Sequence, residues 1–127
     1  YLMRLKNDLP ELLMASASGN LQGHELRWDE RAATCVVMAS GGYPEAYPKG
    51  KVIHGLPQVA DLEDVHVFHA GTARDDSGAW VTSGGRVLGV TALGADLQKA
   101  TQKAYLAVEK IHFEGHHFRR DIAAKAL

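Results

Sequence analysis

Cysteine is almost absent from the chain, since Cys35 is the only one. No intrachain disulfide can form, and a four-thiolate zinc site is excluded. No apolar run approaches the roughly 20 residues that a membrane-spanning helix needs. The N-terminus also lacks the basic, apolar and small-residue order of a secretory signal. We therefore expect a cytoplasmic protein that is stabilised by its core.

The chain has no excess of either charge, because 14 Lys and Arg residues face 15 Asp and Glu residues. Without a broad positive field, neither nucleic acid nor an anionic membrane is an expected partner. A length of 127 residues is enough for one core that buries about two thirds of the unfolded surface. The chain begins at Tyr1 rather than Met, which suggests a fragment or a processed product.

A first helix is predicted over residues 8–18. Asp8 can cap the first backbone amides, and Glu11 stands three residues later, as in a capping box. Gly19 and Asn20 tolerate the left-handed conformation that closes a helix. A second helix is predicted to begin at Asp96, with an apolar stripe from Leu97 to Ile111, and to end at Gly115. Residues 119–127 are expected to form a short turn or helix, with Ile122 and Ala126 facing inward.

The middle of the chain is rich in β-branched and aromatic residues and is broken by turn residues, which is typical of strands. Residues 33–39 form its most apolar run, so we expect this strand to be buried on both faces. The later strands are predicted to form a three-stranded meander, with Gly84 and Gly85 in a type I′ hairpin turn. The predicted strands are 65–69, 79–83 and 86–91, with a turn at 75–78. The fold class is therefore α+β.

The seven histidines invite a metal hypothesis that their spacing does not favour. His66 and His69 are three residues apart on a predicted strand, so they point to opposite faces. His112 and His116 have the predicted helix end at Gly115 between them. Cys35 lies in the apolar strand, where a thiol behaves as a small, unreactive core residue. No metal site and no catalytic residue is predicted in this chain.

Three glycine-containing segments are the candidate ligand contacts. Ser40, Gly41, Gly42 and Tyr43 follow the most apolar strand directly, and loops at strand ends are where ligands usually bind. The alternative is an ordinary long loop stiffened by prolines. The other two segments end or join strands, and they comprise His69, Gly71 and Thr72, and Gly84, Gly85 and Arg86.

Each of these two segments also has a plain structural interpretation. Exposed amides and the Arg86 guanidinium suit a carboxylate or phosphate, although the same residues suit a simple turn. His69 is a possible general acid or base, or a hydrogen-bonded structural residue. No P-loop, dinucleotide fingerprint or nucleophile elbow occurs in the chain.

Taken together and in order, several segments resemble the C-terminal region of glycinamide ribonucleotide synthetase, also called phosphoribosylamine–glycine ligase. The resemblance runs nearly from end to end, and its most specific stretch is Thr82-Ser-Gly-Gly-Arg-Val-Leu-Gly-Val-Thr-Ala-Leu-Gly94. The other matching segments are Arg4 to Leu9, Cys35 to Pro44 with Tyr47 and Lys49-Gly50, His69 to Thr72, Ile111 to Phe113, and Arg119 to Ile122.

The resemblance implies an ATP-grasp ligase of de novo purine synthesis, which joins phosphoribosylamine to glycine and cleaves ATP to ADP and phosphate. It implies ATP and Mg²⁺ in the full-length enzyme but none bound by this fragment, which is expected to be inactive alone. Residues 1–20 would be the tail end of the ATP-grasp core. Residues 21–127 would be a C-terminal domain, a small curved antiparallel β sandwich or half-barrel of the rudimentary single hybrid type with helices at both ends.

By this resemblance, the domain packs on the N-terminal and ATP-grasp lobes of the same polypeptide and helps to wall the cleft for phosphoribosylamine and glycine. The substrate contacts would come from Ser40 to Tyr43, His69 to Thr72 and Gly84 to Arg86, with positioning and anion binding as their role. A free-standing β-rich binding module without catalysis is the alternative. A longer multifunctional chain is also compatible with the sequence.

Overall fold

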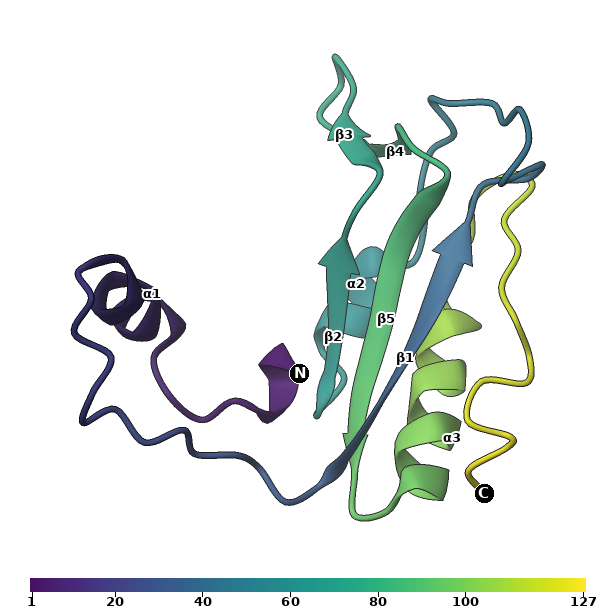
Figure 1. Cartoon of the computed structure of the whole chain (residues 1–127). Helices are drawn as coiled ribbons and strands as arrows, with labels where there is room; N and C mark the ends of the chain where they lie inside the picture. Colours follow the sequence, from purple (N-terminus) through teal and green to yellow (C-terminus); the bar gives the residue numbers. More distant parts are fainter.

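The computed structural model describes residues 1–127, and its centre is an antiparallel sheet with the strand order β1-β5-β2. One face of this sheet is covered by helix α3, and a second, two-stranded sheet lies beyond one end of the strands (Figure 1). The strands are β1 (Ala32–Ala39), β2 (Val65–His69), β3 (Thr72–Arg74), β4 (Trp80–Thr82) and β5 (Arg86–Gly94). The helices are η1 (Leu2–Arg4), α1 (Leu9–Ala17), α2 (Leu56–Ala60) and α3 (Leu97–Val108). The α+β class with small, unclosed antiparallel sheets is confirmed.

Alternate residues of β1 point to opposite faces of the sheet. Val36 pairs with Val90 on the face that packs against α3, and both are fully buried. Cys35 and Val37 lie on the other face and are exposed. The prediction that β1 is buried on both faces, with Cys35 in the core, is therefore wrong. An apolar run shows that a strand can be buried, but only the packing decides how many of its faces are covered.

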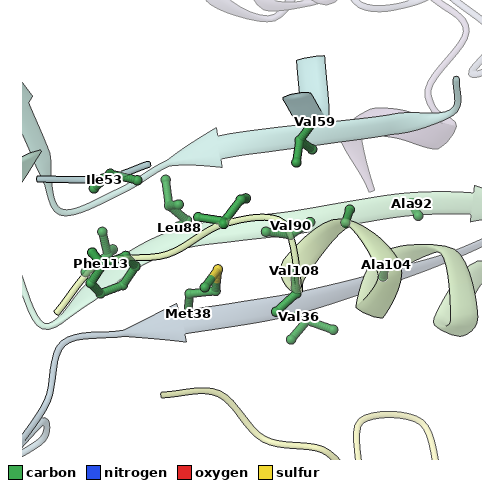
Figure 2. Packing of buried hydrophobic residues seen from close by; sticks show 13 residues of the cluster. Val36, Met38, Ile53, Val59, Leu88, Val90, Ala92, Ala104, Val108 and Phe113 are labelled. Atoms are coloured by element: carbon green, nitrogen blue, oxygen red, sulfur yellow. The ribbon is translucent and has the colours of Figure 1, made fainter. Parts of the chain in front are cut away.

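The core lies between the central sheet and α3, as Figure 2 shows. The helix faces the sheet with small side chains, and Ala100, Ala104 and Ala107 are fully buried. A Cβ at Gly94 would lie 2.3 Å from the backbone nitrogen of Ala100. Small residues on α3 and a glycine on β5 therefore let the two backbones approach closely. Phe113, Met38 and Leu88 fill the core at the other end of the sheet.

The predicted three-stranded meander does not form. Strand β4 pairs with β3 in the small sheet, whereas β5 lies between β1 and β2 in the central sheet. Gly84 and Gly85 have no positive φ, so they do not make a type I′ hairpin turn. The chain instead crosses from one sheet to the other at these glycines.

Both predicted helix starts are confirmed. The Asp8 carboxylate accepts a hydrogen bond from the Glu11 amide at 3.1 Å, and Asp96 accepts one from the Lys99 amide at 2.7 Å. The end of the second helix differs, because α3 stops at Val108, and Gly115 has φ +75° in a later turn. The last residues form turns rather than a further helix, and Ala126 is exposed rather than inward-facing.

The N-terminal segment forms a loop that closes on itself away from α3 (Figure 1). The Lys6 amide donates to the Arg27 carbonyl at 2.9 Å, and the Asp29 amide donates to the Arg4 carbonyl at 2.6 Å. Helix α1 lies inside this loop, and its Leu13 and Met14 side chains are exposed.

An ionic cluster fastens the start of β1 to the rest of the domain. Arg31 forms salt bridges with Asp29 at 2.8 Å and with Asp64 at 2.7 Å. Lys103 of α3 reaches Asp64 at 3.1 Å. These hydrogen bonds hold the pKa of both carboxyl groups below the usual range, with Arg31 the largest cause in each case.

None of the helices combines the length and the apolar character that a membrane-spanning helix needs.

Candidate functional site

The three candidate segments meet at the end of the central sheet where β1 ends and β5 begins. The Ser40 amide donates to the Gly85 carbonyl at 2.8 Å, and the Ser40 hydroxyl donates to the Gly84 carbonyl at 2.9 Å. The Gly71 amide donates to the Arg86 carbonyl at 2.8 Å. Residues far apart in the sequence therefore form one backbone-bonded cluster.

Glycine is required in this cluster by close backbone approach. A Cβ at Gly71 would lie 2.6 Å from the Gly84 Cα, and a Cβ at Gly84 would lie 3.0 Å from the Gly71 Cα. In the first loop, Gly42 has φ +92°, and a Cβ there would lie 2.3 Å from the Ala46 carbonyl oxygen. Both features depend on the absence of a side chain.

A concavity of about 470 Å³ opens beside the cluster on the face of the sheet opposite α3. Its floor is apolar, and the Tyr43 phenol and the Arg86 guanidinium add polar groups. Arg86 is exposed, and none of the salt bridges in the chain involves it. A guanidinium with free donors suits a phosphate or carboxylate, because it can form two parallel hydrogen bonds with either. The lining residues are Val37, Tyr43, Phe68, Ala70, Gly85, Arg86, Leu88 and Gly89.

His69 belongs to the cluster through its backbone segment, but its imidazole does not line the concavity. Its register partner on β5 is the core residue Leu88, so the side chain lies on the face opposite Phe68. The imidazole packs on the Trp80 ring at a centroid distance of 4.2 Å, and its Nδ1 lies 3.0 Å from the Thr72 hydroxyl. Burial, followed by the charges of Arg74 and His66, lowers the pKa of His69 and favours its neutral form.

The apolar floor of the concavity is not among the residues that the sequence predicts. Val37, Phe68 and Gly89 come from three strands, and their side-chain positions share the open face of the sheet. Alternation along β1 and β2 is the signal that would have identified them, once one face was taken as uncovered.

No group of three or more His, Cys, Asp or Glu side chains is placed to hold a metal ion. What the cluster offers chemically is one guanidinium and one phenol beside an apolar surface, on a backbone held by its own hydrogen bonds. Such a set can bind and orient an anionic ligand.

The fold and site define a small α+β domain whose open sheet face ends in a glycine-lined, cationic concavity. The sequence profile of the family described as "Phosphoribosylglycinamide synthetase, C domain" matches residues 33–125. The chain belongs to this family.

Relatives of known name extend the match to nearly the whole chain. The chain is 55% identical to the phosphoribosylamine–glycine ligase of Chlorobaculum tepidum, over 97% of this chain and 29% of that protein. It is 48% identical to the chloroplastic phosphoribosylamine–glycine ligase of Arabidopsis thaliana, over 99% of this chain and 24% of that protein. The chain thus spans less than a third of the length of these relatives.

A solved structure agrees with the fold. The crystal structure of phosphoribosylamine–glycine ligase from Thermotoga maritima superposes with a TM-score of 0.70 at 38% sequence identity. The superposition covers 91% of this chain and 28% of that one.

Proposed function

We propose that this chain is the C-terminal part of a cytoplasmic phosphoribosylamine–glycine ligase of the ATP-grasp type. The enzyme would join phosphoribosylamine and glycine and cleave ATP to ADP and phosphate in de novo purine synthesis. The observation that carries the proposal is the 55% identity over 97% of the chain to a protein of that name. The chain covers only 29% of that relative, so we propose that it forms one part of the enzyme.

In the proposed reaction, the glycine carboxylate takes the terminal phosphoryl group of ATP and becomes an acyl phosphate. The amine of phosphoribosylamine then attacks the carbonyl carbon, phosphate leaves, and the amine loses a proton. Mg²⁺, when bound elsewhere in the full-length enzyme, neutralises charge on the transferring phosphoryl group. ATP and Mg²⁺ belong to the other lobes in this proposal.

The residues of this chain would bind and orient the phosphorylated sugar. The Arg86 guanidinium supplies the anion contact at the rim, and backbone groups of residues 40–43, 71–72 and 84–85 shape the site. The His69 imidazole lies on the far face of the sheet, with its Nδ1 3.0 Å from the Thr72 hydroxyl, and its proposed role is to position Thr72.

The N-terminal and ATP-grasp lobes of the same polypeptide are the proposed partners of the open sheet face. Val37 on this face is exposed, as are Leu13 and Met14 of α1.

Because Arg4 and Lys6 pair with residues 27–29, we place the boundary with the ATP-grasp core near residue 30 rather than at residue 20. The family profile begins at residue 33, which agrees with this placement.

The test is a chimera in which this chain replaces the matching C-terminal stretch of the Chlorobaculum tepidum relative. The chimera should form ADP in a reaction that depends on both glycine and phosphoribosylamine, whereas the 127-residue chain alone should not. Arg86→Ala should raise the KM for phosphoribosylamine roughly tenfold to a hundredfold, because a charge-assisted bidentate contact is lost. Arg120→Ala is the matched control, since Arg120 is also exposed and packs on Phe118.

Two results would contradict the proposal. A folded chimera without activity would favour the free-standing binding module. An Arg86→Ala chimera with a lower Tm but unchanged KM and kcat would make Arg86 structural and remove the concavity from substrate binding.

A further inference from the structure

The base of the loop 40–43 is held by the C-terminal part of the chain as well as by Gly84 and Gly85. Ala39 and His117 exchange two backbone hydrogen bonds, of 2.9 and 3.0 Å. A Cβ at Gly41 would lie 2.7 Å from the Gly115 carbonyl oxygen, so the two segments are in close contact. With both sides of the loop fixed, the direction in which the Tyr43 side chain leaves the backbone is also fixed.

The Tyr43 ring lies directly over Gly85. A Cβ at Gly85 would be 2.1 Å from the ring Cδ2 and 2.6 Å from Cε2, far inside van der Waals contact. The φ of Gly85 is not positive, so an alanine there would meet no backbone strain of the left-handed kind. Glycine at position 85 is therefore required to make room for the Tyr43 ring and not by the backbone conformation.

The ring in this position is one wall of the concavity, and Arg86 is beside it. Behind Tyr43, the Tyr47 ring makes an edge contact at a centroid distance of 6.1 Å and an interplanar angle of 60°. A methyl group at position 85 would push the Tyr43 ring away from the backbone of residue 85 and change the shape of the concavity. The apolar ring face and the neighbouring guanidinium together match a ligand with a sugar body and one phosphate.

The geometry points to Gly85 as a positioning residue that holds the Tyr43 ring as a wall for the sugar of a phosphorylated ribosyl ligand. This inference rests on the proposed function. A side chain added at position 85 would act on the ligand through Tyr43, so its effect on binding exists only while an aromatic ring is present at position 43.

The experiment is a double-mutant cycle in the chimera, with separate KM values for phosphoribosylamine, glycine and ATP. Gly85→Ala should raise the KM for phosphoribosylamine about tenfold or more and leave the other two unchanged, because misplacement by about an ångström is costly in an oriented site. In a Tyr43→Ala background, Gly85→Ala should have no further effect. In a Tyr43→Phe background, which keeps the ring, it should have its full effect.

Gly78→Ala is the matched control for a destabilised chain. Gly78 has φ +82°, and a Cβ at this position would have no neighbouring atom within 4 Å, so its substitution should lower the Tm and leave every KM unchanged. Equal effects of Gly85→Ala with and without Tyr43→Ala would overturn the inference, as would a lower Tm with an unchanged KM. If Arg86→Ala still raises the KM in that case, the proposed function survives, and only the role of Gly85 is refuted.

Discussion

A buried hydroxyl pair joins β1 to α3 and allows a sharp test of the packing. The Thr34 and Thr101 side-chain oxygens lie 3.0 Å apart, and both residues are buried. The Thr101 hydroxyl donates to the Leu97 carbonyl at 2.7 Å, which uses its only proton. Thr34 is therefore the donor in the pair. Thr34 depends on Thr101 for its partner, whereas Thr101 keeps Leu97 if Thr34 is lost.

This asymmetry sets the expected cost of each valine substitution. Thr101→Val leaves the Thr34 hydroxyl buried without an acceptor, which costs about 1–3 kcal/mol of unfolding free energy. Thr34→Val removes one neutral hydrogen bond and costs about 1 kcal/mol. The double substitution replaces both partners with apolar groups of similar shape and should be nearly neutral, within about 1 kcal/mol of the unmodified chain.

The assay is urea unfolding of the purified chain and the three variants at constant pH. With an m-value of about 2 kcal/mol per molar urea, Thr101→Val should lower the midpoint by roughly 1 M. The midpoint of the double variant should return close to that of the unmodified chain. Additive losses, with the double variant the least stable of all, would refute the hydrogen-bond assignment, because independent sites add and coupled ones do not.

Two further predictions concern the ionic cluster and the open face of the sheet. The hydrogen bonds of Asp64 with Arg31, and secondly with Lys103, hold its pKa below the ordinary value of 3.8. The ionised carboxylate therefore stabilises the fold fully above pH 3.8. This stabilisation is lost as the pH falls through the lower pKa of the native state. Asp64→Asn should therefore flatten the dependence of Tm on pH in the acid range, and an unchanged slope would contradict this. Cys35 is exposed, so the native chain should react with about one equivalent of a thiol reagent without denaturant. Reaction only after urea is added would mean that this face is covered.

Local signals predict local structure well in this chain. The caps at Asp8 and Asp96 are confirmed, because a carboxylate that accepts from an amide three residues later needs no distant partner. The strand at Val65–His69 is confirmed for a similar reason, since its β-branched and aromatic residues lie between turn residues. The structure brings the backbones of the three glycine segments together at one end of the central sheet. Their role as substrate contacts stays a prediction.

The wrong sequence-based predictions concern segments whose structure depends on contacts with distant parts of the chain. The pattern at Gly84 and Gly85 predicts a hairpin turn, but these residues are small because Gly71 and Tyr43 lie against them. The pattern at Gly115 predicts a helix end, and this residue instead has φ +75° in a turn after α3, where it leaves no room for a Cβ at Gly41. A glycine required by positive φ and a glycine required by a neighbouring chain are the same letter in a sequence.

The sequence by itself determined the class of the fold, the positions where helices begin, and the resemblance that the family match later confirmed. These properties depend on composition, on spacing over a few residues and on ordered motifs. Only the tertiary structure decided which face of β1 is open, that β5 lies between β1 and β2, and that the His69 ring points away from the concavity. Such features depend on strand register and on contacts between distant segments, because a side chain's surroundings are fixed only when the whole core is packed.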